Sequence, residues 1–457
     1  MKGFPLKLES QEILNNPPFL FIQSNQNLKL FTNTYGGSYI KFNQISISSK
    51  ISSKDNGVFF YIKDKKTEEV WSITPWPTLK SFENYSIEFD TKTLTFKSTY
   101  SGIESILKIV IDQKQNVLVY ELTLRNLTNE IRDLEIVNYS NIVLIDDYRK
   151  YQDHRAFHNL SIQSRFDEEM KGLFFYKRDH NSNSSYPVIF FKFYTESELS
   201  NISFESNRDR FIGRTKDLVR PSGVDLDLTN FCGNILDPVA VFKTSLTLAV
   251  RSKSRLYLSI VCDRFEQNIK NTIEQHLDSF KDVTNYFLEL AQQSIPLLKE
   301  LNIDEIKALL YQRMGSYMIT GNQHTDEIKR NLPTNSGTVD SLWKNKISGD
   351  YPILLVIIDN SFFNELVIDV INFHKYLVRS GYDLDIVFLI DTDPNENTRD
   401  LLVNQISSQG YQNKIDKNTG VFILENYILD DVDSVYLKHF ARLIVNSSNF
   451  NKVLENE

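Results

Sequence analysis

The hydrophobic pattern of this chain changes its period near residue 266, and that change limits what the chain can fold into. From about residue 18 to residue 263, short runs of β-branched and aromatic residues alternate with clusters of Asn, Asp, Gly and Ser. Such runs, with a period of two in places, are typical of strands that bury one or both faces. The length of this stretch, without any helical pattern inside it, predicts a large antiparallel β-sandwich.

Individual runs in this stretch also predict which strands are neighbours. Ile106–Ile111 and Val117–Leu124 flank a polar turn and read as an antiparallel hairpin. Phe242–Val250 and Leu256–Val261 read the same way across the basic turn between them. Val188–Phe193 is almost continuously apolar, which is typical of a strand buried between two sheets.

From Glu266 onward the apolar residues recur at helical spacing. The pattern predicts one long amphipathic helix up to about Ala291, which Pro296 then breaks or kinks. A second helix is predicted from Asp304 to about Ile319, with Asp304 as its N-cap.

The last third of the chain alternates apolar strands with helices. Strands are predicted at 352–358, 384–390 and 420–424, and helices at 361–379, 396–408 and 431–446. This order implies a small parallel sheet with right-handed crossovers. The predicted fold class is therefore multidomain α+β, with an N-terminal extension (1–17), a β-sandwich (18–265), a helical linker (266–345) and an α/β domain (346–457).

Length, charge and cysteine content exclude several classes of protein. A chain of 457 residues exceeds what one core supports, about 250–300 residues. The net charge of −8 argues against nucleic acid and anionic membranes as partners. Cys232 and Cys262 cannot form a disulfide framework, which favours a reducing compartment. The start of the chain lacks the pattern of a signal peptide, and no run of apolar residues is long enough to span a membrane, so we expect a cytoplasmic protein without a membrane span.

Several segments resemble those of one enzyme family, and they occur in the family's order. They are Asn33–Tyr39, Val70–Pro77, His154–Phe157, Asn207–Arg214 and Gly233 with Asp237–Pro238. This series is similar to glycoside hydrolase family 94, formerly glycosyltransferase family 36. A further segment, Ser341–Ile353, resembles the cyclic β-1,2-glucan synthases and the related β-1,2-oligoglucan phosphorylases.

The resemblance implies a galactose-mutarotase-like super-sandwich and an involvement with β-glucan or oligosaccharide. Family members cleave β-glucosides in an (α/α)6 barrel that follows the sandwich, where a carboxylic acid protonates the glycosidic oxygen and phosphate attacks the anomeric carbon. The few helices predicted after Pro352 cannot form that barrel, and no segment resembles the family's acid or its phosphate-binding loops. We therefore assign no catalytic residue, no cofactor and no metal to this chain.

Two tryptophans are candidate sugar contacts. Trp71 and Trp76 could each stack on a pyranose ring, because the CH groups of a sugar face meet an aromatic surface well. The structural alternative is packing in the core or at a strand edge of the sandwich.

The second candidate is a cluster of charged residues in the Asn207–Arg214 segment, namely Arg208, Asp209, Arg210 and Arg214. In the phosphorylases a loop of the sandwich reaches the active site of the barrel, so the resemblance implies that these guanidinium groups contact sugar hydroxyls or steer phosphate. The structural alternative is an Arg–Asp network that fixes a surface loop.

Three further patterns have a structural explanation that we favour. His154 and His158 are four residues apart but lack other ligands at metal-binding spacing. Residues 347–350 form a turn before a buried strand. Asp391–Asp393 follows a buried strand, where a nucleotide-sugar transferase would hold its metal, yet the glycine-rich phosphate loop of a dinucleotide fold does not accompany it.

The sequence therefore predicts a non-catalytic part of a cyclic β-1,2-glucan synthase-like or β-glucan phosphorylase-like system. In this role the chain would be a scaffold with glucan affinity, completed by a barrel-containing catalytic partner chain. Two alternatives stay open: an active glucan phosphorylase or glycosyltransferase in its own right, and an inert remnant of a split gene.

Overall fold

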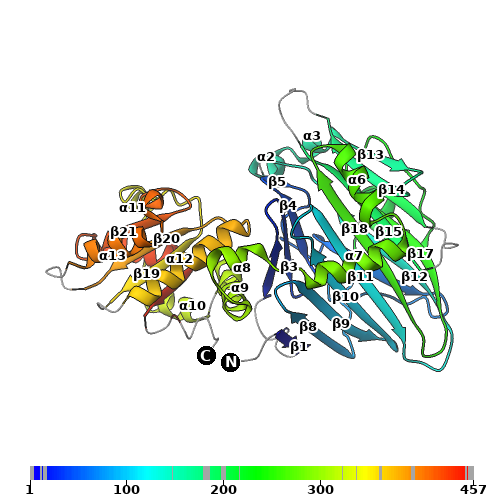
Figure 1. Cartoon of the computed structure of the whole chain (residues 1–457), viewed down its shortest axis with the longest axis horizontal. Helices are drawn as coiled ribbons and strands as arrows, with labels where there is room; N and C mark the ends of the chain where they lie inside the picture. Colours follow the sequence, from blue (N-terminus) through cyan, green and yellow to red (C-terminus); the bar gives the residue numbers. More distant parts are fainter. Residues whose placement is uncertain are drawn as a thin grey trace. The chain divides into compact units, whose positions relative to one another are not determined.

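The computed structural model describes most of the chain (Figure 1). It covers residues 5–10, 13, 18–146, 148–178, 186–196, 202–215, 217–321, 323–335, 337–359, 363–392, 397–447 and 450. These residues form two compact units that divide between Ile295 and Pro296. Residues of the predicted helical linker 266–345 belong to both units, and its first two helices pack on the sandwich.

The larger sheet of the first unit contains nine described strands, all antiparallel to their neighbours. In spatial order they are β1 (Leu6–Glu9), β8 (Asn84–Phe89), β9 (Thr93–Tyr100), β10 (Ile103–Ile111), β11 (Val117–Asn126), β18 (Lys253–Asp263), β15 (Val188–Thr195), β14 (Gly172–Lys177) and β13 (Ile162–Asp167). Strands β10 and β11 confirm the hairpin predicted at the turn before Val117. The predicted N-terminal extension contributes β1, whose residues pair with β8, so part of it is an edge strand of the sandwich.

Two further antiparallel sheets complete the β-structure of this unit. The described five-stranded sheet has the order β16 (Ser203–Asn207), β17 (Pro238–Leu248), β12 (Arg132–Asn141), β6 (Val58–Asp64) and β7 (Val70–Ser72). The described four-stranded sheet has the order β2 (Leu20–Ser24), β3 (Leu28–Asn33), β4 (Ser38–Phe42) and β5 (Ile45–Ser46). Aromatic pairs join the large sheet to the five-stranded sheet: Phe193 stacks on Phe242 at 6.1 Å between ring centroids, and Phe60 packs on Tyr120 at 6.0 Å. The predicted sandwich is confirmed.

The predicted hairpin between Phe242–Val250 and Leu256–Val261 is wrong. Strand β17 pairs with β16 and β12, whereas β18 pairs with β11 and β15, so the short turn at 249–252 passes from one sheet to the other. The two layers of a sandwich are only about 10 Å apart, which a four-residue turn can span. A period of two shows that a strand buries a face but does not show which sheet it joins.

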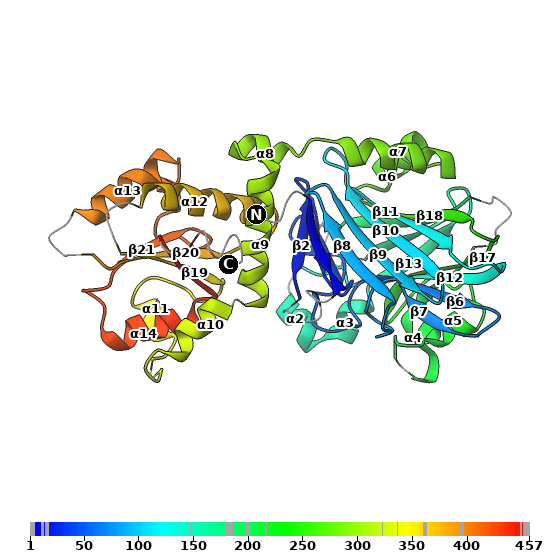
Figure 2. The ribbon, with the colours of Figure 1, turned by 90° about the horizontal axis from the view of Figure 1, so that it is seen from below.

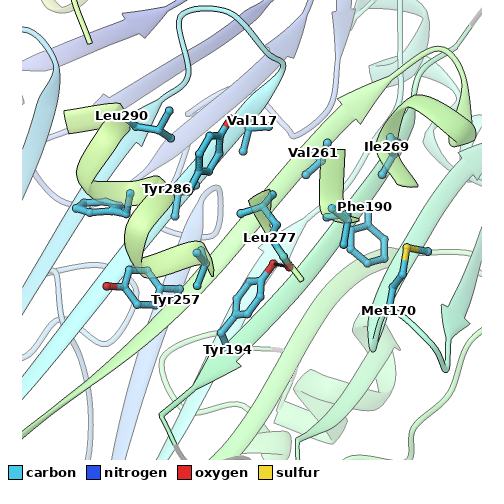
Figure 3. Packing of buried hydrophobic residues seen from close by; sticks show 14 of the residues in the cluster. Val117, Met170, Phe190, Tyr194, Tyr257, Val261, Ile269, Leu277, Tyr286 and Leu290 are labelled. Carbon is cyan, nitrogen blue, oxygen red and sulfur yellow. Dashed lines mark hydrogen bonds between the residues drawn. The ribbon is translucent and has the colours of Figure 1, made fainter. Parts of the chain in front are cut away.

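Two helices, α6 (Glu266–His276) and α7 (Phe280–Gln292), cover the outer face of the large sheet (Figures 1 and 2). Their apolar sides meet residues of β10, β11, β14, β15 and β18 in one buried cluster, part of which Figure 3 shows. Strand β15 is therefore buried between the five-stranded sheet on one side and these helices on the other. The sequence had predicted that it is buried between two sheets. The predicted single helix is two helices because Ser279 and Asp282 form a capping box that starts α7.

Smaller helices of the first unit connect its strands. They are α2 (Tyr148–Asp153), α3 (Arg155–Asn159), α4 (Arg208–Ile212), the 3-10 helix η1 (Gly213–Thr215) and α5 (Ser222–Asp225).

The second unit is a parallel α/β domain with helices before it. The described parallel strands have the order β21 (Val421–Glu425), β20 (Asp385–Ile390), β19 (Ile353–Ile358) and β22 (Leu443–Asn446). Its helical segments are α8 (Pro296–Leu301), α9 (Glu305–Thr320), α10 (Gln323–Arg330), α11 (Asp340–Trp343), α12 (Asn364–Arg379), α13 (Thr398–Ser408), η2 (Gln412–Lys414) and α14 (Asp431–Phe440). Helix α9 confirms the prediction, with the Asp304 side chain accepting from the Lys307 N–H.

The predicted last helix, 431–446, is too long. Helix α14 ends at Phe440, and Leu443–Asn446 forms β22, which pairs in parallel with residues 354–357 of β19. A four-residue apolar run fits either a helix end or a short buried strand, and its pairing with β19 decides between the two.

Candidate functional site

The five-stranded sheet opens into a polar cleft at the end where β12 stops and β17 starts. The cleft has a volume of about 350 Å³. It is lined by the loop 49–56, by Tyr148 and Tyr151 of α2, and by residues of α3, α4 and β17. We call it the arginine cleft, after Arg155 and Arg208 on its wall.

A buried glutamate shapes the backbone that carries Arg208. Glu205 lies on β16 where the register with β17 shifts, and its Oε1 accepts from the backbone N–H groups of Ser206 (3.0 Å) and Asn207 (2.9 Å). The Asn207 side chain then caps α4 by accepting from the Asp209 N–H. Arg208 is thereby fixed at the first position of α4, at the edge of the cleft.

Arg208 and Arg155 share one carboxylate. Arg208 Nη1 lies 3.5 Å from Asp237 Oδ2, and Arg155 Nη2 donates to Asp237 Oδ1 at 3.2 Å. Arg208 Nε also donates to the Tyr139 hydroxyl at 3.1 Å. One carboxylate thus orients two guanidinium groups, each of which keeps further N–H donors for a ligand.

The hydroxyl of Tyr139 is a protonated group in this wall. Burial raises the pKa of Tyr139 to about 12, although the charge of Arg208 opposes part of this rise. The phenol therefore keeps its proton at neutral pH.

The cleft also offers acceptors. Asp55 Oδ1 and Asn141 Oδ1 are buried, and neither accepts a hydrogen bond from the part of the chain that the structure describes. A buried acceptor without a partner is costly, and a ligand hydroxyl that donates to it removes that cost. Two positive and two negative side chains around a hydroxyl and an amide suit a neutral ligand that carries many hydroxyls.

The predicted charged cluster divides in the structure, and only Arg208 lines the arginine cleft. Asp209 and Arg214 are exposed. Arg210 lies over the ring of Phe231, 4.0 Å from its centroid, and donates to Thr229. None of these three residues lines the arginine cleft.

The two predicted tryptophans have different surroundings. Trp71 on β7 is only 1% exposed and packs against Tyr100, so neither face of its ring is open to a sugar. Trp76 is partly buried, stacks on Tyr35 at 5.5 Å, and lies so close to Gly37 that a Cβ there would be 2.8 Å from the indole. Glycine at position 37 therefore serves the packing of Trp76.

The remaining predicted patterns do not form a second site. His154 is exposed on the edge of α3, and no group of three His, Cys, Asp or Glu side chains among the described residues is placed to hold a metal ion. Asp391 accepts from the Asn426 side chain at 2.9 Å, while Asp393 lies outside the described residues. The segment 347–350 forms a turn, with Gly349 at a φ of 76°.

Six residues of the arginine cleft and its support were not predicted as site residues, namely Asp55, Tyr139, Asn141, Arg155, Glu205 and Asp237. Arg155 and Asp237 do lie in the segments that carry the family resemblance. The presence of both residues in the ordered series of family-like segments was the available signal that these distant parts of the sequence meet in space.

Comparison with known proteins agrees with this architecture. Residues 10–279 match the family model of the glycosyl hydrolase 94 supersandwich domain. The cyclic beta-(1,2)-glucan synthase NdvB of Rhizobium meliloti (strain 1021) is 20% identical over 388 residues, which cover 82% of this chain and 14% of that protein. The N,N'-diacetylchitobiose phosphorylase of Vibrio proteolyticus is 21% identical over 171 residues, which cover 37% of this chain and 20% of that enzyme.

Among solved structures, a bacterial glucoamylase in complex with acarbose aligns with a TM-score of 0.36 and 12% identity, covering 66% of this chain and 41% of the enzyme. The chain thus spans only a small part of the length of its two sequence relatives. None of the helices described here is both long and apolar enough to cross a membrane.

Proposed function

The chain belongs to the glycosyl hydrolase 94 family through its supersandwich domain, and from that premise we propose that it is a non-catalytic, glucan-binding part of a carbohydrate-active system. The system would resemble a cyclic β-1,2-glucan synthase or a β-glucan phosphorylase. In this proposal the sandwich holds the glucan in the arginine cleft, and another domain carries out the chemistry.

One observation carries this proposal. Three segments that are distant in sequence, and that all belong to the family pattern, supply Arg155, Arg208 and Asp237 to a single cleft. A network that only fixed a surface loop would not need a cavity of about 350 Å³ with two buried acceptors on its wall. The cavity has the size of a small ligand pocket.

The chemistry of the cleft suits sugar hydroxyls. The guanidinium groups of Arg155 and Arg208 donate, whereas the oxygens of Asp55, Asn141 and Asp237 accept. Each hydroxyl of a glucosyl residue can both donate and accept, so it can bridge a guanidinium and a carboxylate. The shared carboxylate Asp237 holds the two donors in place before the ligand arrives, which lowers the entropy lost on binding.

Calorimetric titration of the whole chain with a linear β-1,2-glucan oligosaccharide tests the proposal. Arg155→Ala removes a half-exposed donor, so the fold should persist while affinity falls about tenfold, as expected for hydrogen bonds from a charged group. Arg125→Ala, on the exposed face of β11, is the matched control and should bind as the unaltered chain does. Equal affinity of the Arg155→Ala variant and the unaltered chain would contradict the assignment of the cleft.

The non-catalytic role has its own test. The purified chain is incubated with a β-1,2-glucan, with and without inorganic phosphate. We expect neither sugar phosphate nor new reducing ends. Release of either product by the chain alone would overturn this part of the proposal and favour an active phosphorylase or hydrolase.

We further propose that a barrel-bearing catalytic partner covers this end of the sandwich. Large apolar side chains lie exposed within five residues of Arg155 or Asp237, namely Phe157 (73% exposed), Leu160 (59%) and Leu236 (60%). Exposed apolar residues grouped beside a functional cleft are typical of interaction surfaces. Co-expression with a barrel-bearing family member, followed by gel filtration, should give a complex that Phe157→Asp separates. Leu226→Asp, which alters an exposed leucine at the C-cap of α5, should leave the complex intact.

A further inference from the structure

Toward the opposite end of β17, hydroxyl-bearing residues appear among the inward-facing side chains of the sandwich. Phe242 of β17 stacks on Phe193 of β15 inside the sandwich. Side chains on one face of a strand recur every two residues, so the next inward positions on these strands are Thr244 and Thr195. On β18 the inward series ends similarly, because Leu256 is followed toward the turn by Ser254.

These residues line a second cavity of about 260 Å³, which we call the hydroxyl mouth. Its wall includes Thr195, Thr244 and Ser254, the charged residues Glu196, Lys253 and Arg255, and apolar side chains such as Leu256. The mouth therefore combines hydrogen-bonding groups with an apolar surface, as a sugar ring itself does. Its volume is somewhat below that of pockets for drug-sized ligands, about 300 Å³ or more, which suits a single glucosyl unit.

Thr244 is the residue that points to a ligand. It is only 3% exposed, and its Oγ1 has no hydrogen-bond partner among the residues that the structure describes. A buried hydroxyl without a partner costs free energy. Thr244 lines the cavity, and a ligand hydroxyl there can supply the missing bond when rotation of the Thr244 side chain turns its buried Oγ1 toward the cavity.

The charged residues of the mouth are also available. Ser254 Oγ donates to Glu196 Oε2 at 2.8 Å, which orients an exposed carboxylate at the rim. Within the described residues, Arg255 forms no ion pair. Together with Lys253, which also lines the mouth, the rim presents one carboxylate that accepts and two cationic groups that donate, and all three can hydrogen-bond to the hydroxyls of a polyol.

We propose that the hydroxyl mouth binds a glucosyl residue of the same glucan, as a second site independent of the arginine cleft. This inference rests on the proposed function for the identity of the ligand, but not for the site. Pro238 lines the arginine cleft and Thr244 lines the mouth, so the two sites are six residue steps apart along β17, roughly 20 Å at about 3.3 Å per step. A glucan long enough to reach both sites would be held more tightly than by either one.

Titration of the whole chain with a β-1,2-glucan oligosaccharide too short to bridge the two sites tests this inference. We expect two ligands per chain, one of them bound about tenfold more weakly in Arg155→Ala. In that background, Thr244→Val should weaken the other site about fivefold, as loss of one hydrogen bond predicts, and Glu196→Gln should weaken it independently without a risk to folding, because Glu196 is exposed.

Thr32→Val is the matched control for Thr244→Val. Thr32 is 2% exposed, and its Oγ1 also has no partner among the described residues, but it does not line the mouth. Both variants should change thermal stability similarly, and only Thr244→Val should change affinity.

The possible outcomes separate the two proposals. One ligand per chain, bound about tenfold more weakly in Arg155→Ala, would overturn the second site and leave the proposed function standing. Binding that is unaffected by Arg155→Ala but weakened by Thr244→Val would overturn the assignment of the arginine cleft and support the mouth. Absence of any binding would overturn both, and affinity equal in Thr244→Val and Thr32→Val would mean that the hydroxyl serves the fold alone.

Discussion

Asp385 shows how burial of one carboxylate couples this fold to pH. The residue begins β20 and is fully buried, and its Oδ1 accepts from the backbone N–H groups of Thr419 (2.7 Å) and Gly420 (3.4 Å). Its Oδ2 has no partner within the described structure. Burial raises the pKa of Asp385 to about 6, even though the two N–H groups favour the charged form.

We predict that the second unit loses stability as pH rises from about 4 to about 6. In this range the Asp385 carboxyl ionises readily in the unfolded chain, whereas in the fold its burial opposes ionisation. The folded protein binds this proton more tightly than the unfolded chain, so the contribution is complete below pH 4 and is lost as pH passes through 6. Asp385→Asn should remove a pH-dependent difference on the order of 1–2 kcal/mol in the free energy of unfolding, after allowance for solvent screening. Denaturant titration at pH 4, 5, 6 and 7 measures it, and an unchanged slope in the variant would contradict the assignment.

For the residues of the arginine cleft, the sequence alone could indicate candidates but could not show which of them line the cleft. Arg208 was a candidate because charged residues gather around it, but the same argument also selected Asp209, Arg210 and Arg214, which point elsewhere. Whether a guanidinium lines a cavity depends on partners such as Tyr139 and Asp237, which other strands bring to it. Trp71 illustrates the same limit, because its burial depends on how β7 pairs with β6 and not on its neighbours in sequence.

At the scale of elements, a buried lysine joins α6 and α7 to the large sheet. Lys192 of β15 donates to the carbonyl oxygens of Leu277 (3.2 Å) and Asp278 (2.6 Å), between the two helices. Tyr194, two residues on, donates to the same Leu277 oxygen at 2.8 Å. These donors satisfy carbonyl groups that the end of α6 leaves without helical partners. Burial lowers the pKa of Lys192 to about 8.

We predict that the first unit gains stability as pH rises from about 8 to about 10 because Lys192 is neutral there in the fold but still charged in the unfolded chain. A lowered lysine pKa means that the unfolded chain binds more protons in this window, so unfolding becomes less favourable as pH increases. Lys192→Met should flatten this part of the stability profile. Tyr194→Phe removes the hydrogen bond to the same Leu277 carbonyl. Because burial raises the pKa of the Tyr194 phenol, this substitution should lower stability without flattening the profile. A profile of Lys192→Met that rises as steeply as that of the unaltered chain would contradict the role of the lysine.

The elements themselves were largely predictable, whereas their partners were not. The change of hydrophobic period located the start of α6, and the apolar runs located β19, β20 and β21. The assignment of β17 and β18 to one sheet was wrong because alternation is the same for a hairpin and for a turn between sheets. Strand β22 was missed because its pairing with β19 lies in tertiary contacts.

At the scale of the whole molecule, the two units have separate cores. The buried clusters under α6 and α7 and under α4 and α5 contain only residues that precede Pro296. The cluster around β19, β20 and α14 contains only residues that follow it. Each unit is also large enough to unfold cooperatively by itself.

We predict two transitions in differential scanning calorimetry. Asp385→Asn should shift only one of them, and Lys192→Met only the other, because each substitution lies in a different unit. Scans at pH 5 and pH 9 should show the larger effects of Asp385→Asn and Lys192→Met, respectively. A single transition that both substitutions shift equally would mean that the units unfold together.

The pairing of β17 on both sides has a further consequence for any change in its length. The strand is hydrogen-bonded along β12 and β16 and carries the arginine cleft at one end and the hydroxyl mouth at the other. Inserting one residue would turn every side chain beyond it to the opposite face, exchanging Thr244 with an outward neighbour. The distance between the two sites can therefore change only by an even number of residues, in steps of about 7 Å. A relative adapted to a different glucan repeat would have to lengthen or shorten the strand by that step.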